Sequence, residues 1–138
     1  MRRYLILLAI ALSLAAARNT FSGEHPRTPE EKRAWHYDGL LGETYDDTWR
    51  VAARIKPGKP VNEFQAYVLV SAYFYAYING CGGANLPKLH GEKWIADSVV
   101  GIAGSQGPKI IVDAKTGVTY SPGHEIVKDP KVYRKFIR

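Results

Sequence analysis

The stretch Asn62–Asn79, which reads NEFQAYVLVSAYFYAYIN, decides the fold of this chain. From Phe64 to Ile78 only Gln65 and Ser71 interrupt the run of apolar and tyrosine side chains, so apolar surface covers nearly the whole circumference of a helix. Such a helix is either buried on most sides or embedded in a membrane. Its 15 residues are too few to cross a bilayer, which takes about 20. The stretch therefore predicts a central core helix that packs on a sheet.

Both ends of this helix carry boundary signals. Asn62 can accept a hydrogen bond from a free amide of the first turn, and Gln65 occupies the third helical position, as in a capping box. Gly80 follows the last residues of the stretch and can adopt the left-handed conformation that commonly ends a helix. These signals predict a helix that spans residues 62–79.

Beyond the core helix the sequence changes to a period of two. A strand that begins at Lys93 should present alternate residues to one face, namely Trp94, Ala96, Ser98, Val100 and Ile102. Residues 104–108 are typical of a turn, and residues 109–113 of the next strand. Asp113–Gly117 is typical of a hairpin loop, after which residues 118–120 should return antiparallel.

The segment before the core helix is less regular. Thr28 followed by Pro29 and Glu31 predicts a capped helix that runs to about Tyr37. Residues 48–56 alternate between one apolar and one more polar or small side chain, which favours a half-exposed strand. A short helix after Asp46 and Asp47 is the alternative.

The elements together predict an α+β fold in which one long buried helix packs on a curved antiparallel sheet. At the C-terminus, Asp129 and Pro130 predict one or two further helical turns that end near Ile137. We expect residues 28–138 to form a single domain, preceded by a flexible N-terminus at residues 18–27.

The first residues are typical of a secretory signal peptide. Arg2 and Arg3 precede an apolar run, Tyr4–Ala17, which has 14 residues and ends in three alanines. The run is too short for an ordinary transmembrane helix. We therefore expect cleavage after Ala17 and a periplasmic or secreted protein with no stable membrane span once the leader is removed. An uncleaved anchor is the alternative.

Composition narrows the function classes. Removing 17 residues from 138 leaves 121, enough for one domain with a real core. The leader holds two of the 19 basic residues and none of the 13 acidic ones, so the mature chain carries a net charge of +4. This mild excess does not indicate a nucleic-acid partner. Cys81 is the one cysteine, so no intramolecular disulfide can form.

The sequence contains no recognisable catalytic set. Cys81 follows the C-terminal end of the core helix, where the helix dipole disfavours a thiolate, so we interpret it as a structural residue that closes the core beside a glycine turn. The four histidines lack metal-ligand spacing: His25, His36, His90 and His124. We therefore expect no catalytic, cofactor or metal-binding residues, and hence no enzyme.

Two features nevertheless point to binding. Aromatic residues on the core helix and the first strand are candidates to line an apolar pocket: Tyr67, Tyr73, Tyr77 and Trp94. Tyr73 and Tyr77 should share a helix face, although aromatic residues at helical spacing also serve as plain core. The basic C-terminal tail could dock an acidic partner or an anionic lipid surface: Lys128, Lys131, Arg134, Lys135 and Arg138.

The segment Val61–Tyr120 carries a family likeness in its order of helix, glycine turn, Trp-led strand at Lys93, glycine-rich turn, and hairpin around Asp113–Gly117. In this order it resembles the nuclear-transport-factor-two-fold immunity proteins of bacterial polymorphic toxin systems. The hairpin also resembles peptidase-propeptide modules. Either resemblance implies a binding protein, and the first implies a cone-like fold.

The resemblance implies an exported protein that binds a cognate toxin and neutralises it by occlusion, which needs a complementary surface and no catalytic residue. The alternatives are a small-molecule-binding protein or enzyme that uses a pocket between helix and sheet, a peptidase-propeptide-like inhibitory module, and a structural envelope protein.

Overall fold

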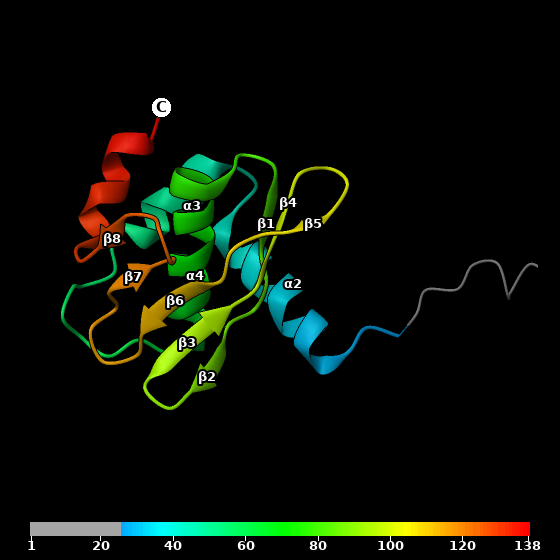
Figure 1. The fold of residues 1–138 in the computed structure, drawn as a ribbon, viewed down its shortest axis with the longest axis horizontal. Helices are drawn as coiled ribbons and strands as arrows, with labels where there is room; N and C mark the ends of the chain where they lie inside the picture. Colours follow the sequence, from blue (N-terminus) through cyan, green and yellow to red (C-terminus); the bar gives the residue numbers. More distant parts are fainter. Residues whose placement is uncertain (1–25) are drawn as a thin grey trace, which may run out of the picture.

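The computed structural model describes residues 26–138, which form an α+β fold of four helices and two antiparallel sheets (Figure 1). The predicted leader, residues 1–17, and residues 18–25 of the predicted flexible N-terminus lie outside the described residues. Within residues 26–138, no helix combines the length and the apolar character needed to cross a membrane.

Helix α2, Pro29–Leu41, begins as its sequence predicts. The Thr28 hydroxyl accepts a hydrogen bond from the Glu31 amide, and the Glu31 side chain accepts one from the Thr28 amide. The helix continues four residues past the expected end at Tyr37. It stops at Gly42, whose φ of 100° is open to glycine and strained for other residues.

Helix α3, Tyr45–Ala52, corrects the strand that the alternation of residues 48–56 favoured. A second capping box starts the helix, because Thr44 and Asp47 bond each other's amides. The buried residues Thr48, Trp49 and Ala52 then fall on one helical face that packs against α4. The indole Nε1 of Trp49 donates to the carbonyl of Ala72 at 3.1 Å, which fixes this face in place.

Helix α4, Glu63–Tyr73, and its π-helical continuation η1, Phe74–Ile78, confirm the core helix and its Asn62 cap. The predicted left-handed stop at Gly80 is wrong. The helix instead widens into π turns, so the Asn79 amide bonds the carbonyl of Phe74, and Asn79 itself is extended. The Asn79 side chain then accepts from the amide of Cys81 and turns the chain toward the first strand.

The strands form two antiparallel sheets. The three-stranded sheet has the order β1-β4-β5 and consists of β1 (Gly82–Ala84), β4 (Ser98–Val100) and β5 (Ser105–Gln106). The five-stranded sheet has the order β2-β3-β6-β7-β8 and consists of β2 (Lys88–His90), β3 (Lys93–Ala96), β6 (Ile110–Asp113), β7 (Thr119–Tyr120) and β8 (Ile126–Val127).

The single strand expected from Lys93 to Ile102 is two strands in different sheets. The chain leaves the five-stranded sheet at Asp97, whose carbonyl accepts from the amide of Asn85, and enters the three-stranded sheet at Ser98. Ala96 and Ser98 are buried as the period of two predicts, but Ile102 is 98% exposed in the following turn. That turn falls at residues 101–104, so the predicted turn at residues 104–108 begins too late.

The hairpin between β6 and β7 forms as predicted. The Asp113 carboxylate accepts from the amides of Lys115 and Thr116, and Gly117 takes a φ of 75°. β7 then pairs antiparallel with β6, Val112 facing Thr119.

The C-terminal helical turns are a 3-10 helix, η2 (Pro130–Phe136), which Asp129 caps and which packs on α3. Figure 1 shows α4 at the centre of the domain, with the strands of the five-stranded sheet along one side of it. Because α3 contacts α4 as well, the central helix is covered from more than one direction. Residues 66–73 of α4 are accordingly all buried.

Candidate functional site

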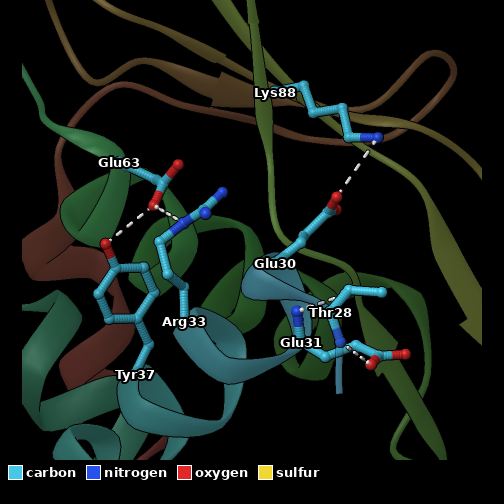
Figure 2. Close-up of polar contacts among 7 residues, drawn as sticks. All are labelled: Thr28, Glu30, Glu31, Arg33, Tyr37, Glu63 and Lys88. Carbon is cyan, nitrogen blue, oxygen red and sulfur yellow. Dashed lines mark hydrogen bonds and ion pairs between the residues drawn. The ribbon is translucent and has the colours of Figure 1, made fainter. Parts of the chain in front are cut away.

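Helix α2 is held on the domain by polar contacts that Figure 2 shows. The Glu63 carboxylate, at the start of α4, accepts a hydrogen bond of 2.9 Å from Tyr37 Oη and lies 3.1 Å from Arg33 Nε. Nearer the start of α2, Glu30 lies 3.7 Å from the ammonium group of Lys88 on β2. Leu41 is the one residue of α2 that is fully buried. Helix α2 therefore contacts α4 and the edge strand β2 through polar side chains and buries little of its own surface.

Two adjoining cavities lie along α2, between this helix and α4 with β1. Their volumes are about 330 Å³ and about 510 Å³, and Asp38, Tyr67 and Ala84 line both. We call them together the Asp38 cleft. The end of the cleft nearest α3 is lined by Glu43 and Tyr45. The cleft thus lies among three helices and a strand, not between the core helix and the five-stranded sheet.

A hydrogen bond between Tyr67 and Asp38 lies at the centre of the cleft. Tyr67 Oη donates to Asp38 Oδ1 at 2.6 Å, and the tyrosine is only 6% exposed. Burial is the main cause that raises the pKa of the Tyr67 phenol, and the bond to the Asp38 carboxylate raises it further. The phenol therefore remains a donor over the whole physiological pH range. Asp38 is exposed, so its second oxygen is open to a ligand.

A stacked pair of tyrosines forms one wall of the cleft. The rings of Tyr45 and Tyr75 lie 4.3 Å apart at an interplanar angle of 20°. Tyr45 Oη donates to the carbonyl of Gly80, which ties the start of α3 to the end of the core helix. Burial raises the pKa of Tyr75, with smaller contributions from Tyr45 and from the negative charge of Asp38. The wall therefore presents the neutral phenol of Tyr75 beside a carboxylate.

The charge of the cleft is opposite to the net charge of the chain. Four carboxylates line the two cavities: Glu30, Glu31, Asp38 and Glu43. Among residues 26–138 no Lys, Arg or His lines them, although Lys88 pairs with Glu30 from outside the lining and the chain carries a formal net charge of +6. Residues 26–138 contain no group of three or more His, Cys, Asp or Glu side chains that could hold a metal ion. The four carboxylates can attract an organic cation, such as an ammonium or guanidinium group.

Exposed aromatic residues border this cleft. Trp35 is 68% exposed and lies four residues after Glu31 and three before Asp38, so it shares a face of α2 with two residues that line the cleft. The Arg27 guanidinium lies 4.9 Å from the centre of the Trp35 ring. Tyr45, at the other end, is 44% exposed. Large exposed aromatic side chains beside a charged cleft are typical of protein-binding surfaces.

The structure places Tyr67 in this cleft and the other predicted pocket residues elsewhere. Tyr73 is fully buried, donates to the carbonyl of Glu125, and packs its ring 5.1 Å from that of Tyr77. Tyr77 lies against Phe136 of η2, with ring centres 5.4 Å apart. Tyr73 and Tyr77 therefore share a face, as their spacing predicts, and that face contacts the C-terminal segment.

Trp94 lies apart from these tyrosines. It is half-buried, and its indole Nε1 donates to the carbonyl of Val61 at 3.2 Å. This bond joins β3 to the loop that precedes α4. The four residues that the sequence singles out are thus distributed over three different contacts and do not converge on one cavity.

Sequence reasoning missed Asp38, Tyr45 and Tyr75 as site residues. Asp38 and Tyr67 are 29 residues apart, and no local pattern connects them. The expected end of the helix at Tyr37 left Asp38 outside it, so the sequence offered no signal that joins Asp38 to Glu31 on one helix face.

Cys81 is exposed, which corrects its predicted place in the core. The π turns and the Asn79 side chain direct the chain outward at this point, so a glycine turn does not seat the residue against the core helix.

Comparison of the chain with protein-family models, curated proteins and solved structures finds no match.

Proposed function

We propose that the protein binds a protein partner and neutralises it by occlusion, as the immunity proteins that it resembles do. The observation that carries this proposal is the Asp38 cleft, which is acidic on a basic chain and has exposed aromatic residues at its border. Occlusion requires a complementary surface, so no catalytic residue has to be found.

In the proposed complex, a Lys or Arg side chain of the partner enters the cleft. Its charged group binds the free oxygen of Asp38, while Tyr67 holds the other oxygen in place. Tyr45 and Tyr75, which stack on each other, line the same end of the cleft and can pack against the apolar stem of that side chain. Trp35 packs on the partner beside the cleft, since large aromatic residues provide most of the binding energy in such surfaces.

The remaining parts of the proposal come from the sequence. The predicted leader would carry the protein to the periplasm or out of the cell, where the partner acts, and the partner would be a toxin effector whose gene lies beside this one. The cone-like shape of the resembled family belongs to the same proposal. The basic tail and the Asp38 cleft have opposite charges, so they would contact different parts of a partner.

A competition experiment tests this function. Deleting the gene should make cells sensitive to sister cells that carry the neighbouring toxin, and the exported wild-type protein should restore resistance. Trp35→Ala and Asp38→Asn should restore much less, while Glu92→Gln should restore full resistance because Glu92 is exposed, pairs with Lys115, and lines neither cavity. Unchanged fitness of the deletion strain, or equal rescue by all three variants, would count against the proposal.

A small organic cation is the second candidate occupant, favoured by the size and the polar lining of the same cleft. A diamine such as putrescine would bind Asp38 through one ammonium group and Glu43 or Glu31 through the other. Titration calorimetry with putrescine distinguishes the two. Micromolar binding that Asp38→Asn abolishes would favour the small-molecule function. The absence of measurable heat would favour a protein side chain as the occupant of the cleft.

A further inference from the structure

A third cavity lies at the start of α4, away from the Asp38 cleft. It has a volume of about 450 Å³ and is bounded by the end of α3, the loop of residues 53–61 and the first turns of α4. None of its lining residues lines the Asp38 cleft. We call it the basic groove, and define it by its floor and its cations: Val51, Ile55, Phe64 and Val68 below, with Arg54, Lys56 and Lys59 at the mouth.

The floor of the basic groove is apolar. Val68 is fully buried at its base, while Val51, Ile55 and Phe64 are half-buried and so present part of their surface to the cavity. Apolar surface in a concave site favours an apolar ligand group, because that group leaves water when it binds.

The three cations at the mouth are exposed, and within residues 26–138 none of them takes part in an ion pair. Glu63 is the acidic residue next to the groove in sequence, but Figure 2 shows its carboxylate turned toward Arg33 and Tyr37 of α2. Glu63 therefore does not neutralise the positive charges at the mouth of the groove. Positive charge above an apolar floor complements a ligand with a negative head and an apolar tail.

The groove is held open by bonds to the sheet. The amide of Gly58 donates to the carbonyl of Thr116 at 3.0 Å, and the amide of Val61 donates to the carbonyl of Ala114 at 2.9 Å. These bonds pin both halves of the loop to the hairpin between β6 and β7. A ligand therefore meets a preformed site and does not have to order the loop.

The polar groups of the lining indicate an alkyl chain in preference to a peptide. Asn62 and Gln65 are the uncharged polar side chains in the groove, and each already uses its carbonyl oxygen to accept a backbone amide in the capping box of α4. Pro60 has no N–H group to donate. A bound peptide would bury backbone groups that need partners, whereas an alkyl chain buries none.

We propose that the basic groove binds a single-chain anionic amphiphile, namely a medium-chain carboxylate. Its carboxylate lies among Arg54, Lys56 and Lys59, and its alkyl chain lies on Ile55, Phe64 and Val68. This site is independent of the proposed partner complex, since the basic groove and the Asp38 cleft share no lining residue.

Calorimetric titration of the full chain with sodium decanoate, below its critical micelle concentration, tests the proposal. Decanoate should bind about 15-fold more tightly than octanoate, because each of its two additional methylenes contributes a gain of about fourfold when buried. Decyltrimethylammonium has the same tail and the opposite charge, so it should bind at least about tenfold more weakly than decanoate.

Charge variants give the second arm of the test. Lys56→Gln with Lys59→Gln should weaken decanoate binding about five- to tenfold. Lys128→Gln with Lys131→Gln removes the same charge from exposed positions elsewhere and should leave it unchanged. Asp38→Asn should also leave it unchanged, so failure of the proposed partner complex and failure of this site are separate results.

Three outcomes would overturn the proposal. One is a carboxylate affinity that does not rise with the length of the alkyl chain. Another is equal affinity of the two double Lys→Gln variants for decanoate. The third is binding of an acidic pentapeptide with a central phenylalanine under conditions where decanoate does not bind, which would assign the groove to a protein segment.

Discussion

Tyr67 Oη lies 2.6 Å from Asp38 Oδ1, and this hydrogen bond joins the central helix α4 to the outer helix α2. The phenol is almost fully buried, whereas the carboxylate faces solvent. The bond thus fixes the orientation of an exposed charge from inside the core. It has a stabilising role for α2 and a positioning role for Asp38, and the two roles can be tested separately.

Removing the hydroxyl group of Tyr67 tests the stabilising role. Tyr67→Phe should lower the free energy of unfolding by about 1.5 kcal/mol, the lower end for a hydrogen bond to a charged group, because the exposed Asp38 regains water. Urea unfolding followed by circular dichroism measures the change. Tyr120→Phe is the matched control, since Tyr120 bonds only the exposed Lys93, and it should change stability by less than about 0.5 kcal/mol. Equal effects of the two variants would show that the Tyr67 bond contributes little.

The raised pKa of Tyr67 predicts a pH dependence. Tyrosines of the unfolded chain ionise near pH 10, whereas burial and Asp38 keep Tyr67 protonated to higher pH in the folded protein. The unfolded state therefore loses its proton first. This contribution to stability is fully present below about pH 10 and is lost as the pH rises above it.

Urea unfolding at several values between about pH 9 and pH 11 measures this loss. The free energy of unfolding of Tyr67→Phe should fall less steeply with rising pH than that of the wild type, by up to about 1.4 kcal/mol per pH unit. Other tyrosines with raised pKa values, among them the half-buried Tyr75 and the fully buried Tyr133, should preserve part of the decline. Identical slopes for the variant and the wild type would contradict the assignment to Tyr67.

The sequence predicted correctly those features whose contacts join residues close together in the chain. The capping boxes at Thr28 and Asn62 and the loop at Asp113 each involve partners within three residues, and all three form. The apolar run of α4 likewise predicted its burial, because a helix that is apolar all round needs cover on several sides.

Longer-range relations decided the rest. Residues 48–56 alternate as a strand would, but burial of Trp49 against Ala72 selects a helix. The strand from Lys93 divides at Asp97 because two separate sheets each pair with one half of it. The Asp38 cleft depends on contacts between segments about 30 residues apart, for which a single sequence contains no pattern.

The central position of α4 and its continuation η1 predicts a large cost for a cavity at Phe74, the first residue of η1. Phe74 is fully buried, so Phe74→Ala should lower the free energy of unfolding by about 3 to 5 kcal/mol. Ile102→Ala should change it by less than about 0.5 kcal/mol, since Ile102 is 98% exposed. Thermal unfolding of both variants measures the difference. A melting temperature of Phe74→Ala close to that of the wild type would contradict the core assignment.

Cys81 is exposed, and the proposed function does not use it. Cys81→Ser should therefore change the free energy of unfolding by less than about 0.5 kcal/mol and should preserve protection in the competition experiment. Loss of protection by a variant that folds normally would instead indicate a role for the thiol.

The dissociation constant of the complex with the neighbouring toxin, measured by calorimetry for the wild type and for Asp38→Asn, tests the central claim most directly. A one-to-one complex should form, and Asp38→Asn should weaken it about tenfold or more, because the partner's cation loses its counter-charge within a contact that excludes water. Glu92→Gln should bind as the wild type does. An unchanged dissociation constant for Asp38→Asn, or no complex with the wild type, would contradict the claim that this cleft binds a protein partner.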